Sequence, residues 1–171
     1  GIAFRRDSAE LLAGQRDFIR HINLASGSVT RQWRAGGSVH SLAFHPVHQQ
    51  LAIGYLNAEI ASVYDLTGGA PPAELPVGTI GEQVVAWHPD GVRLAISGIH
   101  PLIQIWDVAA KRRLATLGGH VQQVIGLSFH PKGELLASIG YDAVFRLWCA
   151  ASGRLLLEMP RSVWAFGFST D

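Results

Sequence analysis

The chain has 171 residues and a formal net charge of +1, which is about one domain of sequence and gives no long-range field that would collect nucleic acid. Hydrophobic residues make up 48% and charged residues 16%, so an intrinsically disordered chain is excluded. Cys149 is the single cysteine, which excludes a disulfide-stapled scaffold and favours a reducing, cytoplasmic location. No apolar run approaches the ~20 residues that cross a bilayer, so no membrane partner is expected.

A short apolar segment that ends in an aromatic residue recurs along the chain at intervals of about 40 residues. The copies are Ile2-Ala3-Phe4, Leu42-Ala43-Phe44, Val85-Ala86-Trp87, Leu127-Ser128-Phe129 and Ala165-Phe166-Gly167-Phe168. A His-Pro pair follows each of the middle three copies, at His45, His88 and His130. Because proline fixes φ and a nearby glycine admits positive φ, these pairs predict a tight turn after the first strand of each repeat.

The third strand of each repeat has the clearest alternation of side chains. In Val144-Phe145-Arg146-Leu147-Trp148 one set of side chains can face a core, and Arg146 is expected to face water. Turn residues such as Ala151-Ser152-Gly153 then lead to a fourth strand. Each repeat therefore predicts four short antiparallel strands, and no helical period competes with them.

A four-stranded unit of this length is what a β-propeller blade needs, because one blade cannot bury both of its faces alone. We predict an all-β propeller with four full blades, at residues 1–36, 37–79, 80–119 and 120–161. Residues 162–171 are predicted to be the first strand of a fifth blade. Since propellers have about 4 to 8 blades, further blades are expected to come from the parent chain or from a second copy.

The repeats contain sequence motifs that are typical of a known family. The best copy runs from Gly119-His120 to Trp148, and the preceding repeat contains the literal pair Trp106-Asp107. On these residues the chain resembles the Trp-Asp (WD) repeat family of β-propellers, over essentially its whole length. The third repeat departs from the family pattern, since Gly81-Glu82 stands where the family has Gly-His.

The resemblance implies a buried, hydrogen-bonded tetrad of His120, Ser138, Asp142 and Trp148 in the last full repeat. An aspartate in a tight turn can orient an imidazole, which then bonds a hydroxyl and, through it, an indole N–H. His120 beside Asp142 also resembles an acid–base pair. We expect a structural role instead, because Ser138 should lie in a strand rather than on an exposed nucleophile turn.

The three histidines of the His-Pro turns raise the alternative of a metal site. Equivalent positions on successive blades splay around a ring, whereas metal ligands converge on one ion. We therefore expect His45, His88 and His130 to be turn-capping, solvent-facing residues, and we expect no metal and no other cofactor.

The family resemblance implies a non-catalytic scaffold for protein–protein interactions, whose partners are other proteins of unknown identity and not nucleic acid. Loops between the second and third strands and before the first strands are the expected contact sites. Candidate partner-binding residues are Arg16, Tyr55, Leu56, Ile99, His100, Gln122 and Tyr141, which could equally be ordinary loop residues. The alternative is a propeller enzyme or small-ligand module that uses the central channel. Such a module needs polar side chains on the first strands, which here are almost entirely apolar.

Overall fold

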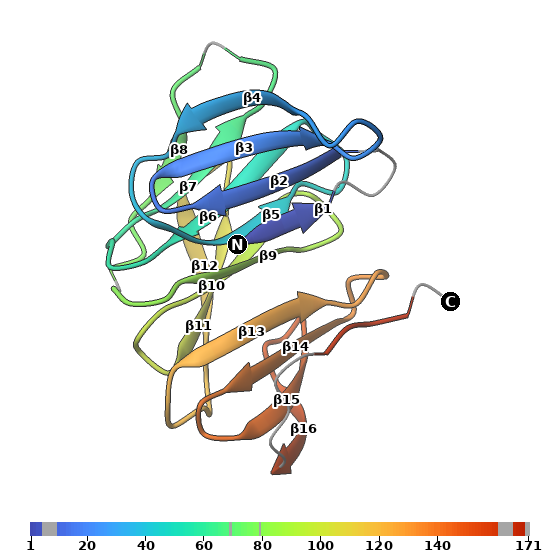
Figure 1. Ribbon diagram of the computed structural model, residues 1–171. Helices are drawn as coiled ribbons and strands as arrows, with labels where there is room; N and C mark the ends of the chain where they lie inside the picture. The colour runs from blue at the N-terminus through green and yellow to red at the C-terminus, as the bar shows by residue number, and fades with distance from the viewer. Residues whose placement is uncertain (5–9, 69, 79, 161–165, 170–171) are drawn as a thin grey trace.

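The computed structural model describes residues 1–4, 10–68, 70–78, 80–160 and 166–169, and these residues form strands and turns without a helix. The strands assemble into four separate four-stranded antiparallel sheets, which are the blades of a β-propeller (Figure 1). Within the described ranges there is accordingly no helix long and apolar enough to cross a membrane. The prediction of an all-β propeller with four-stranded blades is confirmed.

Each blade is a meander in which consecutive strands pair. Blade 1 consists of β1 (Ile2–Phe4), β2 (Glu10–Gln15), β3 (Phe18–Asn23) and β4 (Val29–Arg34). Blade 2 consists of β5 (Val39–Phe44), β6 (Gln50–Tyr55), β7 (Ala61–Asp65) and β8 (Ala73–Leu75). Blade 3 consists of β9 (Val84–Trp87), β10 (Arg93–Ser97), β11 (Leu102–Asp107) and β12 (Arg112–Gly118). Blade 4 consists of β13 (Val124–Phe129), β14 (Leu135–Gly140), β15 (Val144–Cys149) and β16 (Leu155–Pro160).

The blades follow one another as a fan, with the first strands β1, β5, β9 and β13 in contact in that order (Figure 1). Apolar clusters fill the spaces between neighbouring blades, because each sheet presents one set of alternating side chains to the blade before it and the other set to the blade after it. Central members of the clusters are Leu12, Leu51 and Ile53 between blades 1 and 2, Leu75, Leu94 and Trp106 between blades 2 and 3, and Ile103, Leu136 and Trp148 between blades 3 and 4.

The His-Pro turns also join neighbouring blades, which the sequence did not suggest. His45 Nε2 donates to the carbonyl oxygen of Gly91 at 2.8 Å, while its Nδ1 accepts the backbone N–H of His48 at 2.8 Å. His88 Nε2 lies 2.8 Å from the carbonyl oxygen of Gly133 in the next blade. The expectation of solvent-facing histidines is therefore wrong for His45 and His88, which are buried, although the turn-capping role is present.

The end of the described chain packs on blade 4. Residues 161–165 and 170–171 of the predicted fifth first strand lie outside the described residues, and residues 166–169 belong to none of the strands in the described ranges. The rings of Phe168 and His130 nevertheless pack edge to face, with their centroids 5.1 Å apart. The rings of Phe129 and His88 pack in the same way, with a centroid distance of 4.9 Å. Phe166 contacts Phe145 of β15 at 5.6 Å. Phe168 thus repeats the contact that the first strand of blade 4 makes with blade 3.

Candidate functional site

A chain of hydrogen bonds links the four residues of the expected tetrad. The indole Nε1 of Trp148 donates to Ser138 Oγ at 2.8 Å, and this hydroxyl lies 2.8 Å from His120 Nε2. His120 Nδ1 lies 2.9 Å from Asp142 Oδ2. Because a carboxylate only accepts, Nδ1 carries the proton, and Ser138 donates to Nε2. This arrangement satisfies every polar group in the chain of bonds with a neutral imidazole.

Arg146 is a fifth member that the sequence assigned to solvent. Its side chain is buried, and Nη1 donates to Asp142 Oδ2 at 2.8 Å while Nη2 pairs with Glu158 Oε2 at 2.9 Å. The expectation that Arg146 faces water is wrong. Arg146 lies two residues before Trp148, so the alternation of β15 places both side chains on the face that packs against blade 3.

Burial and hydrogen bonding shift the pKa values of His120 and Asp142. Burial lowers the pKa of His120, although Asp142 beside it acts in the opposite sense. Burial alone would raise the pKa of Asp142, but hydrogen bonds from His120, Arg146 and the backbone N–H of Val121 outweigh it, so the pKa of this carboxyl lies below its ordinary value. The folded state therefore holds a neutral imidazole against an ionised carboxylate.

The lowered pKa of His120 predicts that acid destabilises the fold. Above the unfolded-state pKa of about 6.5 the imidazole is neutral in both states, whereas below it only the unfolded state takes up a proton freely, so stability falls with pH. His40 and His45 act in the same direction, because burial lowers the pKa of each. We expect the free energy of unfolding, measured in urea, to be lower at pH 5.0 than at pH 7.5. A flat profile over this interval contradicts the assignment.

In blade 3 the indole N–H of the tryptophan donates to a glutamine rather than to a serine. Trp106 Nε1 donates to Gln104 Oε1 at 2.9 Å, and Gln104 Nε2 donates to the carbonyl oxygen of Val77 in blade 2 at 2.8 Å. The fully buried Gln83 likewise bridges the blades, since its Oε1 accepts from the backbone N–H of Tyr55 at 3.0 Å. Glutamine side chains thus replace the histidine-based network where the family pattern is absent.

A second feature lies at one end of the fan, where the turns between second and third strands meet the segments that enter the next first strands. Residues 80–82 are the meeting point of three blades. Leu56 of blade 2 forms a β-bridge with Glu82, the backbone N–H of Ile99 bonds the carbonyl oxygen of Ile80 at 2.7 Å, and Tyr141 of blade 4 donates its hydroxyl to Glu82 Oε2 at 3.2 Å.

Large apolar side chains are exposed around this meeting point. We call Leu56, Ile80, Glu82, Ile99, Val121 and Tyr141 the end surface; apart from Glu82, which is half-buried, all of them are exposed. The interlocking turns hold these side chains in place through backbone hydrogen bonds between blades, such as Gln83 N–H to the carbonyl oxygen of Tyr55 at 3.0 Å. An exposed apolar group on a rigid frame is typical of a docking site.

The structure divides the partner-binding residues expected from the sequence into exposed residues and one buried residue. Leu56, Ile99 and Tyr141 belong to the end surface, and Arg16, His100 and Gln122 are exposed on turns at the same end of their blades. Tyr55 is wrong as a contact residue, because it is 0% exposed and packs in the cluster between blades 1 and 2. Ile80 and Val121 were missed, since they lie in connecting segments without a repeated pattern. Glu82 carried a signal, as the residue that replaces the family's histidine.

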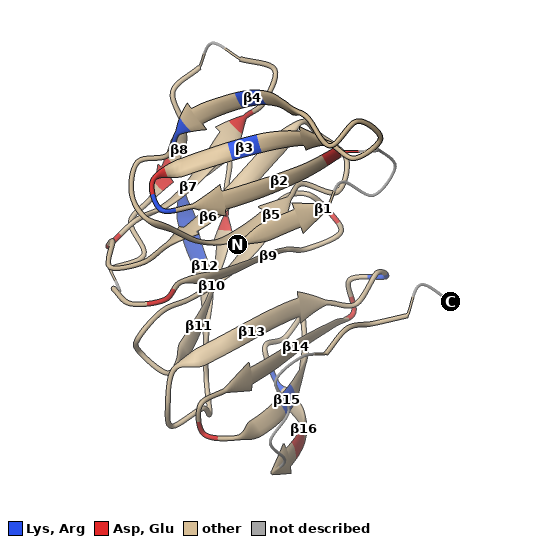
Figure 2. Cartoon of the chain, in the orientation of Figure 1, with Lys and Arg blue, Asp and Glu red and all other residues tan. Residues whose placement is uncertain are grey.

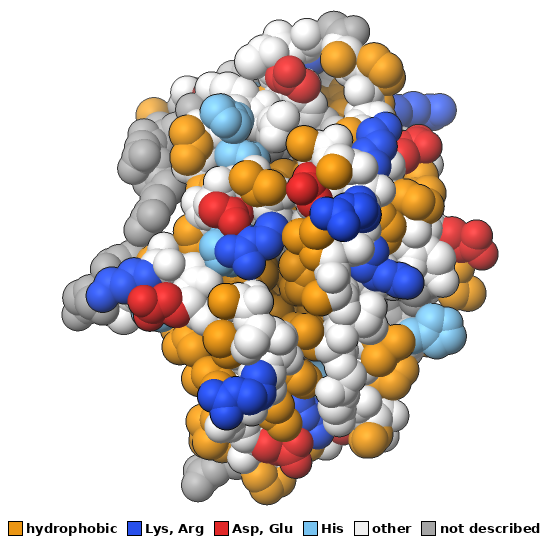
Figure 3. Space-filling view, turned by 180° about the vertical axis from the view of Figure 1, so that it is seen from behind, with side chains coloured by type: hydrophobic (Ala, Val, Ile, Leu, Met, Phe, Trp, Pro, Cys, Tyr) orange, Lys and Arg blue, Asp and Glu red, His pale blue; other side chains and the backbone are white. Residues whose placement is uncertain are grey.

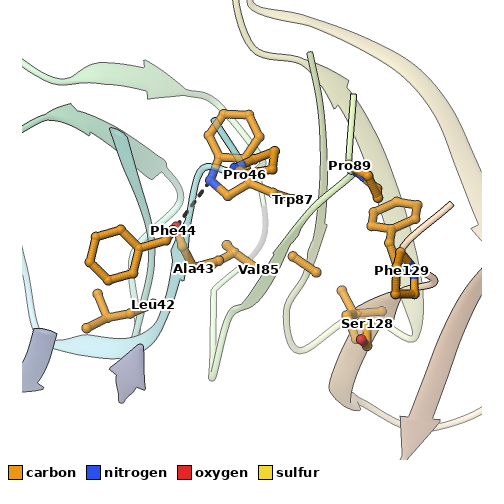
Figure 4. A pocket seen from close by; sticks show the side chains of 12 residues that line it. Leu42, Ala43, Phe44, Pro46, Val85, Trp87, Pro89, Ser128 and Phe129 are labelled. Atoms are coloured by element: carbon orange, nitrogen blue, oxygen red, sulfur yellow. Dashed lines mark hydrogen bonds between the residues drawn. The ribbon is translucent and has the colours of Figure 1, made fainter. Parts of the chain in front are cut away.

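The first strands line a cleft of about 400 Å³ on the inner side of the fan. Figure 4 shows its wall, formed by Leu42, Phe44, Val85 and Phe129, with Ser128 as the one polar side chain drawn. Trp87 also lines the cleft, and its indole Nε1 donates to the carbonyl oxygen of Ala43 at 3.1 Å. Among the described residues that line the cleft there is no pair of ionisable groups for acid–base chemistry.

The face of the molecule seen in Figure 3 carries charges of both signs. Figure 2 marks the charged residues along the chain, and on the face seen in Figure 3 basic and acidic side chains are interspersed with hydrophobic ones. This pattern does not form the single-sign field that steers a polyanion.

Comparison with known proteins agrees with the geometry. A family model described as "WD domain, G-beta repeat" matches residues 111–149, which contain the whole hydrogen-bonded network except Glu158. The chain is also similar to the Pre-mRNA-processing factor 19 homolog 2 of Arabidopsis thaliana, with 30% identity over 93 residues. This alignment covers 53% of the chain and 18% of that protein, so the chain spans a small part of its relative's length.

Proposed function

Since this chain belongs to the WD-repeat family, we propose that it is a non-catalytic scaffold that binds other proteins through the end surface. The observation that carries the proposal is the cluster of exposed apolar side chains, fixed by turns from three blades around residues 80–82. Interface centres are enriched in such apolar and aromatic anchors, which a polar rim surrounds. Interaction scaffolding is also the general role of the family.

The buried network supports a non-catalytic role. Ser138, His120 and Asp142 have the donor order of a nucleophilic triad, but the Ser138 side chain is 0% exposed and its hydroxyl already bonds Trp148 and His120. A nucleophile must be within reach of a substrate. The apolar lining of the central cleft also favours the scaffold over the alternative of a channel enzyme.

The terminal blades support an additional partner class, namely further blades from the parent chain or from a second copy. Ile2 and Phe4 of β1 are exposed, whereas the equivalent Trp87 of blade 3 is buried against blade 2. At the other end of the fan, Met159 of β16 is exposed, although its counterparts Leu75 and Leu117 are buried. Apolar faces of this kind favour coverage by another blade. A cytoplasmic location, also proposed, is supported by the free Cys149.

The proposal is tested with two matched substitutions at opposite ends of strand β10. Ile99 in the end surface and Val92 in the opposite turn are each 49% exposed, so Ile99→Asp and Val92→Asp introduce the same charge at similar exposure. Full-length protein carrying each change is used for affinity purification with quantitative mass spectrometry. We expect Ile99→Asp to reduce partner recovery by about tenfold, equivalent to about 1.4 kcal/mol, and Val92→Asp to leave it unchanged. Equal recovery with both variants contradicts the proposal.

A further inference from the structure

Acidic residues predominate in the described turns around the end surface. In blades 2 to 4, the described turns at this end carry the acidic residues Glu59, Glu82 and Asp142 and contain neither lysine nor arginine. The opposite turns of the same blades mix both signs, with Lys111, Lys132 and Arg154 among their residues. The charge that lies within the end surface is therefore the carboxylate of Glu82, while Arg16 of blade 1 is the exposed basic residue at the same end of the described fan.

Glu82 is the carboxylate that lies between two apolar members of the end surface, since it forms a β-bridge with Leu56 and accepts the Tyr141 hydroxyl. Asp142 is 1% exposed at its side chain and is already paired with His120 and Arg146. Glu82 is half-buried between Leu56 and Tyr141, and its Oε2 accepts the Tyr141 hydroxyl. A carboxylate has about four acceptor positions, so this single bond leaves capacity for a second donor.

Tyr141 adds an aromatic surface beside that carboxylate. The tyrosine is 47% exposed, and the negative charge of Glu82 raises the pKa of its hydroxyl. The phenol thus stays neutral and keeps donating to Glu82. An aromatic ring next to a carboxylate suits a guanidinium, which can bond the carboxylate through its fork of N–H groups and stack on a ring face. Lysine offers only a compact point charge in the same place.

We propose that the end surface binds an extended segment of a partner protein in which an arginine is flanked by aliphatic side chains. The guanidinium pairs with Glu82 beside the Tyr141 ring, and the aliphatic side chains contact Leu56, Ile80 and Ile99. This inference rests on the proposed function and specifies the chemistry of the partner. Electrostatic complementarity selects the segment, and burial of the apolar side chains supplies most of the affinity.

A peptide library tests this specificity. The probes are 12-residue peptides of glycine and serine that contain three leucines and one variable position, occupied by arginine, lysine, serine or glutamate. They are screened against the full-length protein. We expect arginine peptides to be enriched over glutamate peptides by about tenfold. Glu82→Lys should reverse that preference and Glu82→Gln should abolish it, whereas Glu134→Lys, at an exposed position in the β13–β14 turn, should leave it unchanged.

The outcomes separate this inference from the proposed function. Leucine peptides that lose binding in Ile99→Asp but show no arginine preference overturn the inference and leave the docking surface in place. An arginine preference that survives Glu82→Lys also overturns it. Absence of any peptide binding that depends on Ile99 counts against both. Matching urea midpoints for all variants establish that they fold alike.

Discussion

Replacing Asp142 with alanine is expected to lower the free energy of unfolding by about 3 to 5 kcal/mol. The carboxylate side chain is 1% exposed and bonds His120, Arg146 and the backbone N–H of Val121. Its removal leaves a buried guanidinium with Glu158 as its remaining carboxylate partner and takes the acceptor from three further donors, His120 Nδ1 and the backbone N–H groups of Val121 and Val144. This is costlier than the loss of a neutral hydrogen bond. Urea unfolding followed by tryptophan fluorescence measures the change.

Glu134→Ala serves as the control for Asp142→Ala, because it removes an exposed carboxylate from the same blade and should alter stability by no more than about 0.5 kcal/mol. Similar losses in the two variants would show that Asp142 does not hold the network together.

Replacing Arg146 with alanine is expected to cost about 2 to 4 kcal/mol, because a buried ion pair is broken on both sides of the guanidinium. Arg113→Ala, at an exposed position of β12, should cost less than about 0.5 kcal/mol. Since Arg146 and Asp142 share a bond, the loss in the double variant should fall short of the sum of the single losses by about 1 kcal/mol or more. Strict additivity would mean that the two side chains act independently.

The repeat architecture could be predicted from sequence because its signals are local. The aromatic ends of Leu42-Ala43-Phe44 and Val85-Ala86-Trp87, and the His-Pro turns after them, report strand and turn without knowledge of neighbouring chain segments. Four copies in register then imply stacking of the blades. The same locality explains why the role of His45 as a link to Gly91 was not visible, since that bond spans two blades.

Alternation within single strands could have corrected the assignments of both Arg146 and Tyr55. Arg146 and Trp148 are two residues apart on β15 and share one face, so a buried Trp148 implies a buried Arg146, which the ion pair with Asp142 makes possible. Leu51, Ile53 and Tyr55 alternate along β6 and all pack in one cluster. This alternation therefore places Tyr55 in the core rather than in a loop.

Part of the end surface could be predicted from the sequence. Leu56, Ile99 and Tyr141 follow strand ends, where turns carry binding residues, whereas Ile80 and Val121 lie in connecting segments that no period marks. Their convergence on residues 80–82 depends on contacts between three blades, including the Tyr141 bond to Glu82. Such contacts arise only from the tertiary arrangement.

Photo-crosslinking from one position in the end surface, compared with one position at the opposite end of the same strand, tests the docking surface most directly. A photoreactive benzoylphenylalanine is placed at position 99 of the full-length protein in one sample and at position 92 in another, since both native side chains are 49% exposed at opposite ends of β10. Irradiation in cells followed by mass spectrometry identifies the partner residues attached to each. Binding through the end surface predicts partner cross-links from position 99 and few or none from position 92. Cross-links to partners from position 92 with none from position 99 would contradict it.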